Sequence, residues 1–154
     1  MLNIVLVEPR IPQNTGNIGR LCVGSNSVLH LIEPLGFVIN DRNLKRAGMD
    51  YWEKLQVHTY PNLEAFWQTH PFSDRHFLAT TKTTTNYLDK SYQMGDYLYF
   101  GREDKGLGEQ IINAHLEQCI TIKMRGDVRS INLANSVAIV LYEALRQDDG
   151  KSTI

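Results

Sequence analysis

The chain opens with an apolar run that contains β-branched residues, residues 2–7, and the run ends abruptly at Glu8-Pro9. An apolar run of this kind is typical of a strand buried on both faces, as in a parallel sheet covered by helices. Further strands are expected at residues 28–32, 56–60, 75–80, 97–101 and 119–122. Between them the pattern predicts helices at 13–26, 61–69, 108–116 and 132–147, and a short helix at 41–47. Asn14 or Thr15 is the expected N-cap of the first helix.

This alternation predicts an α/β fold with three layers around a mostly parallel sheet. The length of 154 residues is that of one domain, so we expect residues 1–154 to form a single unit with a frayed polar tail at 148–154. The last expected helix carries more apolar surface than one core contact needs. Its second contact could be another subunit, or the helix could lie deep within one subunit, and the pattern favours neither.

Composition excludes several function classes. The net charge of −1 argues against indiscriminate nucleic-acid binding, although small basic clusters occur at residues 42–46 and 123–129. The simpler interpretation of each cluster is a solvated surface. No apolar run approaches the ~20 residues that span a bilayer, and the first strand lacks the flanks of a signal peptide, so a cytoplasmic protein without a membrane partner is expected. Cys22 and Cys119 are expected to be reduced core residues. The five histidines lack metal-ligand spacing, so no metal site is expected.

Ligands of parallel α/β sheets bind beyond the carboxyl ends of the strands, where three loops of this chain have unusual composition. The first, residues 8–20, contains Gly16 and Gly19 but not the GxGxxG spacing of a dinucleotide site. Arg20 lies among neighbours that are expected to be buried, so it needs a polar partner. That partner is either a carboxylate, Glu8 or Glu33, or a phosphate or acceptor group of a ligand held by the guanidinium fork.

The second loop, residues 100–108, combines three glycines with four charges, but it has no GK[ST] and is not a P-loop. Its Glu103 could cap the next helix or bind Arg20. In the third loop, residues 122–136, either Ser130 or Asn132 makes a good N-cap for the last helix. Together Ser130, Asn132 and Asn135 exceed what a cap needs.

Taken in this order, the three loops resemble the SPOUT class of RNA methyltransferases. The resemblance is closest to the minimal bacterial enzymes that 2′-O-methylate the wobble nucleotide, cytidine or uridine 34, of certain leucine tRNAs. It rests on Glu-Pro-x-Ile-Pro-Gln-Asn-Thr-Gly-Asn-Ile-x-Arg at 8–20, His-Leu-Ile-Glu-Pro-Leu-Gly-Phe at 30–37 and Asp-Tyr at 50–51. It continues with Gly-Asp-Tyr-Leu-x-Phe-Gly-x-Glu at 95–103 and Arg-Ser-x-Asn-Leu-x-Asn-Ser at 129–136, and so spans nearly the whole chain.

The resemblance implies a C-terminal trefoil knot, a homodimer whose sites borrow from both subunits, and a tRNA substrate. It also implies S-adenosylmethionine as the cofactor, without a metal. The implied cofactor contacts are Ala79, Thr80, Gly101, Ile122, Ser130 and Leu133. The residues that match catalytic positions are Asn14, Arg20, Glu103, Ser130 and Asn132.

Phosphate contacts to RNA would come from Lys45, Arg46, Lys82, Arg102, Lys105 and Arg125. Two features depart from the family pattern: Arg102 stands where many relatives have proline, and residues 126–128 are less polar. Both concern the RNA-facing rim and therefore the choice of nucleotide. The alternatives are a SPOUT enzyme acting on another RNA, such as ribosomal RNA, and a non-catalytic RNA-binding dimer of the same fold.

Overall fold

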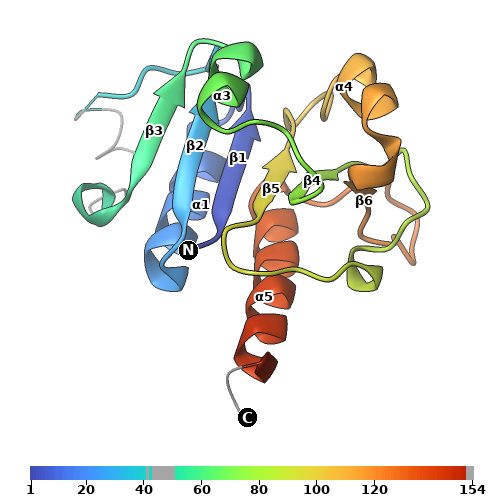
Figure 1. Ribbon diagram of the computed structural model, residues 1–154. Coiled ribbons are helices and arrows are strands. Elements are labelled where there is room, and N and C mark those ends of the chain that lie inside the picture. The colour runs from blue at the N-terminus through green and yellow to red at the C-terminus, as the bar shows by residue number, and fades with distance from the viewer. Residues whose placement is uncertain (41, 43–50, 152–154) are drawn as a thin grey trace.

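The computed structural model describes residues 1–40, 42 and 51–151 (Figure 1). The short helix expected at residues 41–47 lies outside these residues except for position 42. The strands are β1 (Asn3–Val7), β2 (Val28–Ile32), β3 (Val57–Tyr60), β4 (His76–Ala79), β5 (Tyr97–Phe100) and β6 (Cys119–Ile120). The α-helices are α1 (Pro12–Ser25), α3 (Leu63–Thr69), α4 (Glu109–Ala114) and α5 (Leu133–Lys151), and short 3-10 helices lie at η1 (Trp52–Lys54), η2 (Tyr87–Asp89) and η3 (Leu116–Gln118).

The six strands form one sheet in the order β3-β2-β1-β5-β4-β6, and every pairing between them is parallel. Helices lie on both faces (Figure 1), which confirms the predicted three-layer α/β architecture. The first strand is central: β1 pairs with β2 on one side and with β5 on the other. The strand order reverses direction at that point, so the crevice between the loops after β1 and β5 is where this topology binds ligands. The trefoil knot stays a prediction, because strand order does not determine it.

Helices α1 and α5 cover one face of the sheet. Ile18 and Cys22 of α1 and Val137 and Leu141 of α5 are buried in one apolar cluster with alternate residues of the strands. Burial of each such side chain stabilises the fold by roughly 1.5–3 kcal/mol. This layer confirms the expected core face of the last helix. Cys22 and Cys119 are both buried and free, as expected.

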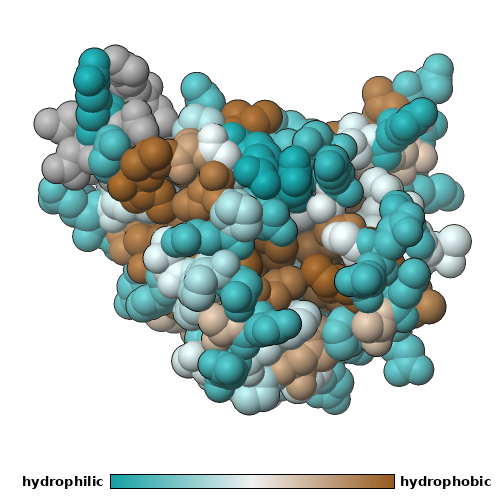
Figure 2. Space-filling view, turned by 90° about the horizontal axis from the view of Figure 1, so that it is seen from above, coloured by the Kyte–Doolittle hydropathy of each residue, from teal (hydrophilic) through white to brown (hydrophobic). Residues whose placement is uncertain are grey.

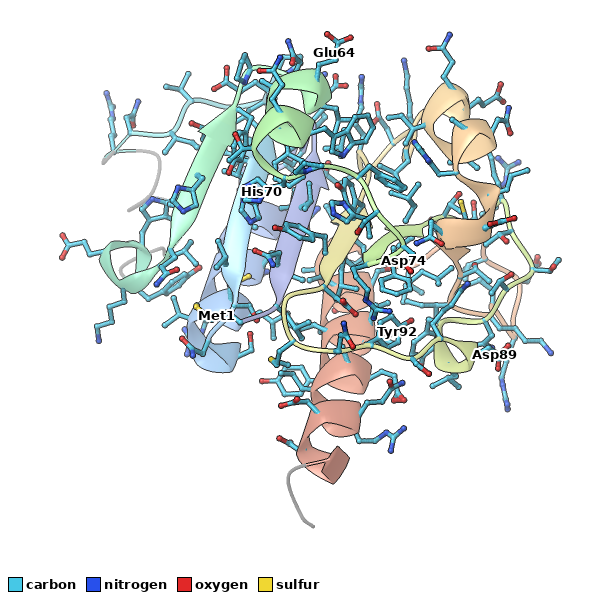
Figure 3. The ribbon with its side chains drawn as sticks, in the orientation of Figure 1. Met1, Glu64, His70, Asp74, Asp89 and Tyr92 are labelled. Atoms are coloured by element: carbon cyan, nitrogen blue, oxygen red, sulfur yellow. The ribbon has the colours of Figure 1, made fainter. Side chains whose placement is uncertain are left out.

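The opposite face, under α3 and α4, carries a group of buried and half-buried rings that we call the histidine–tyrosine cluster. The ring nitrogens of His30 and His70 lie 3.0 and 3.3 Å from the Tyr60 hydroxyl, and His70 Nδ1 lies 2.7 Å from the hydroxyl of Tyr97. His70 sits in front of the sheet beneath α3 (Figure 3). The cluster comprises His30, Tyr60, His70, His76, Tyr97 and Tyr99, and its rings contact Phe66, Trp67 and Phe72.

Histidines in this cluster are held in the neutral form. Burial, reinforced by the nearby His70 and His58, lowers the pKa of His30 to about 3. Burial lowers the pKa of His76 to about 4, and it also lowers the pKa of His70. A charge on these rings would lie in an apolar layer next to other imidazoles, which is unfavourable. Protonation therefore opposes folding of this layer.

Some element boundaries differ from the predictions. Strand β6 has two residues rather than four, and α1 begins at Pro12 instead of after an Asn14 or Thr15 cap. Proline is well suited to the first turn of a helix because the missing N–H has no helical partner there. Residues 148–151, which we expected in a frayed tail, continue α5 in the structure. The Gln147 side chain accepts from Tyr92 N at 2.8 Å and donates to Lys90 O at 3.0 Å, and so anchors the last turns.

Within the described residues, no helix is both long and apolar enough to cross a membrane.

Candidate functional site

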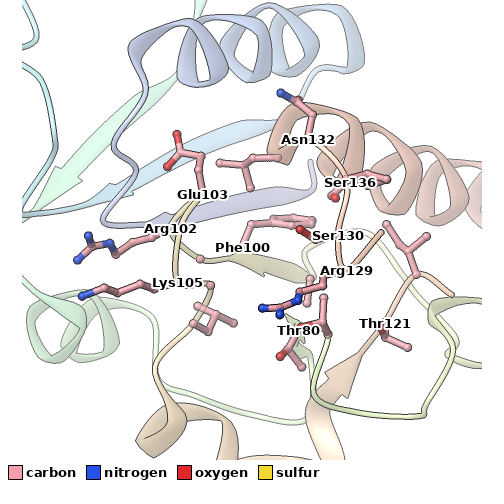
Figure 4. A pocket seen from close by; sticks show the side chains of 18 of the residues that line it. Thr80, Phe100, Arg102, Glu103, Lys105, Thr121, Arg129, Ser130, Asn132 and Ser136 are labelled. Carbon is pink, nitrogen blue, oxygen red and sulfur yellow. The ribbon is translucent and has the colours of Figure 1, made fainter. Parts of the chain in front are cut away.

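A cavity of about 510 Å³ opens beyond the carboxyl ends of β4, β5 and β6, against the start of α1 and of α5 (Figure 4). From this end of the strands, hydrophobic surface is visible in a hollow between hydrophilic side chains (Figure 2). Segments from all three unusual loops line it: Ile11 and Asn14 from the first, residues 100–107 from the second, and residues 129–133 from the third. The expectation that these loops meet is therefore confirmed.

A hydrogen-bonded network of Glu103, Asn14 and Asn132 joins the three loops. The Glu103 carboxylate accepts from the backbone N–H groups of Arg10 and Ile11, at 2.8 Å each, and from Asn14 Nδ2 at 3.2 Å. Asn14 Oδ1 in turn accepts from Asn132 Nδ2 at 3.0 Å. Charge-assisted bonds of this kind are the strong ones. Glu103 thus neither caps α4 nor binds Arg20, because two backbone donors of the first loop occupy its oxygens.

Asn132 has two roles in this network. Its Oδ1 accepts from Asn135 N at 3.2 Å, which is the bond of an N-cap, while its amide group reaches Asn14. The cap fixes the start of α5 and hence the orientation of the amide. Ser130, the other predicted cap, instead lies exposed at the cavity. Asn14 is buried and turned toward Asn132 and Glu103, which explains why it does not cap α1.

The second loop forms a compact wall of the cavity. Arg102 and Gly106 exchange backbone hydrogen bonds of 3.2 and 2.8 Å, which folds the loop back on itself. A Cβ at Gly101 would lie 2.0 Å from the carbonyl carbon of Gly106, so no other residue fits there without moving the loop. Gly106 has a positive φ of 65°, which glycine adopts without strain. At Gly101, therefore, the close approach comes from the backbone of the same loop.

Every residue that the resemblance implied for the cofactor lines this cavity: Ala79, Thr80, Gly101, Ile122, Ser130 and Leu133. Apolar side chains stand beside hydroxyl groups and loop backbone. Such a lining suits a ligand that combines an aromatic ring system with polar groups. Their binding role stays a prediction, but the structure brings all six together.

Arg20 is placed differently from the prediction. It is exposed on α1, and its guanidinium carbon lies 6.0 Å from the centroid of the Tyr51 ring. Its neighbours Ile18 and Cys22 are buried, as expected, but they face the sheet while Arg20 faces away. The expectation that Arg20 is buried like its neighbours in sequence was therefore wrong, because the helical turn separates the two directions. Within the described part of the chain, Arg20 is not among the residues around the cavity.

The cations predicted to contact RNA separate into three groups. Lys82, Arg102 and Lys105 line the cavity, with Lys82 paired to Glu109 at 3.2 Å and Arg102 to Asp104 at 3.0 Å. Arg125 is exposed in the third loop and, among the described residues, is not part of the cavity wall. Lys45 and Arg46 lie outside the described residues.

Further residues at the cavity were absent from the predicted set. Ser136 lines it one helical turn after Asn132, and Arg129, beside Ser130, extends across it in Figure 4. The spacing of four residues from Asn132 to Ser136 was a usable signal, since such residues share a helix face. Thr121 carried no signal, because its position depends on the short ladder beyond β6. Among the described residues, no group of three or more His, Cys, Asp or Glu side chains could hold a metal ion.

Comparison with known proteins identifies the family. The profile of the SpoU rRNA Methylase family matches residues 1–142. A tRNA (cytidine(34)-2'-O)-methyltransferase of Escherichia coli strain K12 is 50% identical over 148 residues, 96% of this chain and 94% of that protein. The enzyme of the same name from Yersinia pestis is 47% identical over 152 residues, 96% of this chain and 94% of that one. The chain therefore belongs to the SpoU methylase family, which confirms the resemblance found in the motifs.

Solved structures agree. One, described as giving structural insights into the 2-OH methylation of C/U34 on tRNA, matches with a TM-score of 0.91 at 39% identity and covers 97% of each chain. The SpoU methyltransferase AviRb of Streptomyces viridochromogenes, in complex with the cofactor AdoMet, matches with a TM-score of 0.79 at 20% identity. That match covers 96% of this chain and 57% of AviRb, and it supports the shared fold.

Proposed function

We propose that this protein transfers a methyl group from S-adenosylmethionine to the ribose 2′-oxygen of the wobble nucleotide, cytidine or uridine 34, in leucine tRNAs. The observation that carries the proposal is the meeting of three distant loops at one cavity through Glu103, Asn14 and Asn132. The near-full-length similarity to enzymes named for that reaction supports the substrate. A cytoplasmic location follows for an enzyme acting on tRNA.

The cofactor would be held by Ala79, Thr80, Gly101, Ile122, Ser130 and Leu133, which line the cavity. When bound, S-adenosylmethionine supplies an electrophilic methyl group on a sulfonium, and this chemistry needs no metal. The chain's contribution is to orient the two reactants and to exclude water, which can account for much of the rate. The bonds that fix Glu103 and Asn132 make the walls rigid before any ligand arrives.

Arg20 is proposed to stabilise the developing charge on the 2′-oxygen and to hold an adjacent phosphate. A guanidinium has no free lone pair and a pKa above ~12, so it is a poor base but a good planar clamp. The proton of the 2′-hydroxyl would pass to the phosphate, or to Ser130 acting as a relay that gives its own hydroxyl proton to solvent. We expect Arg20→Ala and Arg20→Lys both to abolish methylation while calorimetry shows nearly unchanged cofactor affinity. A near-full rate for Arg20→Lys would refute the clamp.

We also propose that the enzyme is a homodimer, with Arg20 of one subunit serving the cavity of the other. Arg20 is exposed on α1 and stands apart from its own subunit's cavity, which supports this arrangement. Mixing inactive Arg20→Ala subunits with inactive Glu103→Ala subunits should restore about a quarter of the wild-type sites, since half of the random dimers hold one intact site. A mixture that stays inactive would place Arg20 in its own subunit's site.

The substrate is tested by nucleoside mapping. Mass spectrometry of tRNA from cells with and without the gene should show loss of the 2′-O-methyl group at position 34 of leucine tRNAs. Labelled cofactor offered with unmodified tRNA or with ribosomal RNA separates this reaction from that of a ribosomal RNA enzyme. If calorimetric titration with S-adenosylmethionine detects no binding, the non-catalytic RNA-binding dimer is favoured.

A further inference from the structure

A second cleft, of about 560 Å³, lies next to the proposed cofactor cavity. The two share five lining residues: Thr81, Thr121, Ile122, Met124 and Arg129. The two hollows are therefore adjacent.

The second cleft has fixed walls. Its sides are residues 81–86 and 121–129, and Asn86 and Thr121 pair in parallel between them. Thr121 N donates to Thr85 O, and Tyr87 N donates to Thr121 O, both at 2.9 Å. These backbone bonds extend the sheet beyond β6. The cleft is thus formed by the fold itself and does not depend on a ligand.

Polar side chains in this cleft can donate hydrogen bonds. The Thr83 hydroxyl oxygen accepts from Thr85 N at 3.3 Å, and Asn86 Oδ1 accepts from Leu88 N at 3.0 Å. The hydroxyl proton of Thr83 and the amide protons of Asn86 then remain to be donated. The hydroxyl of the exposed Thr84 can donate as well. A ligand whose oxygens accept hydrogen bonds, such as a phosphate, fits these donors.

The charge of the cleft also favours an anionic ligand. Lys123 and Arg129 line it, both exposed, and no Asp or Glu of the described residues does so. Asp127 belongs to the same loop but stands outside the lining. Lys82 and Arg102, by contrast, are paired with Glu109 and Asp104. Across residues 1–40, 42 and 51–151, Lys123 and Arg129 have no such ion pair, so their charge is available to a ligand.

We propose that this cleft binds a backbone phosphate of the RNA strand, next to the nucleotide whose ribose reacts in the first cavity. Lys123 and Arg129 supply the charge, and the hydroxyl and amide groups of Thr83, Thr84 and Asn86 supply directed hydrogen bonds. The proposal rests on the proposed RNA substrate. It assigns the main phosphate contacts to Lys123 and Arg129 in place of the carboxylate-paired Lys82 and Arg102.

The test compares Lys123→Ala, Lys123→Glu and Thr84→Val with the control Lys82→Ala, using unmodified leucine tRNA. Lys123→Glu should raise the tRNA Kd at least about tenfold. It should also reduce the steepness with which the logarithm of the association constant falls with the logarithm of the salt concentration, by about one. Lys123→Ala should weaken binding by a smaller factor, with the same loss of slope. Thr84→Val should raise the Kd about two- to fivefold without changing the slope, because it removes a hydrogen bond but no charge.

Calorimetry with S-adenosylmethionine should give the wild-type affinity for all three variants at residues 123 and 84. The proposal is overturned if Lys123→Glu binds tRNA like the wild type, or if it loses cofactor affinity while keeping tRNA affinity. A Lys82→Ala effect as large as that of Lys123→Ala also overturns it. Failure of the proposed function is distinguishable, since the wild-type protein itself would then leave position 34 of the tRNA unmethylated.

Discussion

Two groups of side-chain hydrogen bonds join segments that are distant in sequence, and they differ in what surrounds them. The Glu103–Asn14–Asn132 network stands at the wall of a cavity and fixes its shape. The histidine–tyrosine cluster lies under α3 and α4, and none of the five histidines, all of them described, lines that cavity. The first network organises a surface that must accept ligands, whereas the second completes a layer of the core. Removing a polar atom should therefore affect catalysis in the first and stability in the second.

The largest effect is expected for Glu103→Ala. It leaves the N–H groups of Arg10 and Ile11 without their carboxylate and frees Asn14 from its position. Methylation should fall at least about a hundredfold, while the free energy of unfolding falls by about 1–3 kcal/mol. Steady-state kinetics and urea unfolding measure the two. Glu117→Ala, an exposed change on η3, is the control. The contrast would be contradicted if the loss of methylation in Glu103→Ala were no larger than its loss of folded protein explains.

The next effect is on stability at acidic pH. Since the pKa values of His30 and His76 are lowered to about 3 and about 4 on folding, the unfolded chain binds protons first as the pH falls. Above pH ~6.5 the neutral histidines do not reduce the free energy of unfolding. Below pH ~6.5 the free energy of unfolding falls by about 1.4 kcal/mol per pH unit for each histidine, until the folded-state pKa is reached. Urea titrations from pH 7.5 to 4.5 measure this slope.

His30→Asn should lose about half of that acid slope, while Thr59→Ser, an exposed change on β3, should retain it. The absolute stability of His30→Asn does not matter to the test, because the slope alone reports the proton uptake. A slope identical to that of the wild type would show that His30 is not kept neutral.

The smallest effect is expected for Tyr99→Phe. Its buried hydroxyl accepts from Trp67 Nε1 at 2.9 Å and lies 2.7 Å from His76 Nδ1. Loss of the hydroxyl leaves these groups unsatisfied, at a cost of about 1–2 kcal/mol. Thermal unfolding should show the loss, and the cofactor affinity and methylation rate of the folded protein should match the wild type. Tyr142→Phe, on the exposed side of α5, should change neither, and a slowed Tyr99→Phe enzyme would link the cluster to the site.

The sequence predicted the fold because each strand and helix has a local pattern. Apolar runs marked the buried strands, and Asn132 was identifiable as a cap from its own neighbourhood. The network around Glu103 was not identifiable from local sequence, because Asn14 lies 89 residues away from Glu103 and 118 residues away from Asn132. The predicted burial of Arg20 was wrong for a related reason. Buried neighbours in sequence do not bury a helical residue whose side chain points away from the core. The histidine–tyrosine cluster was also missed, because metal-ligand spacing is a local signal and this cluster gathers rings from several strands and from His70, which follows α3.

The position of β1 in the middle of the sheet has a consequence for biosynthesis. Asn3 pairs with Val28 on one side but with Tyr97 on the other, so one edge of the first strand stays unpaired until most of the chain has left the ribosome. The cavity is completed later still, because its last wall is supplied by residues 129–136. A chain interrupted before α5 would expose the apolar sheet face that Val137 and Leu141 cover, a surface prone to aggregation. Synthesis of the last helix therefore converts an aggregation-prone intermediate into a protein with a complete ligand cavity.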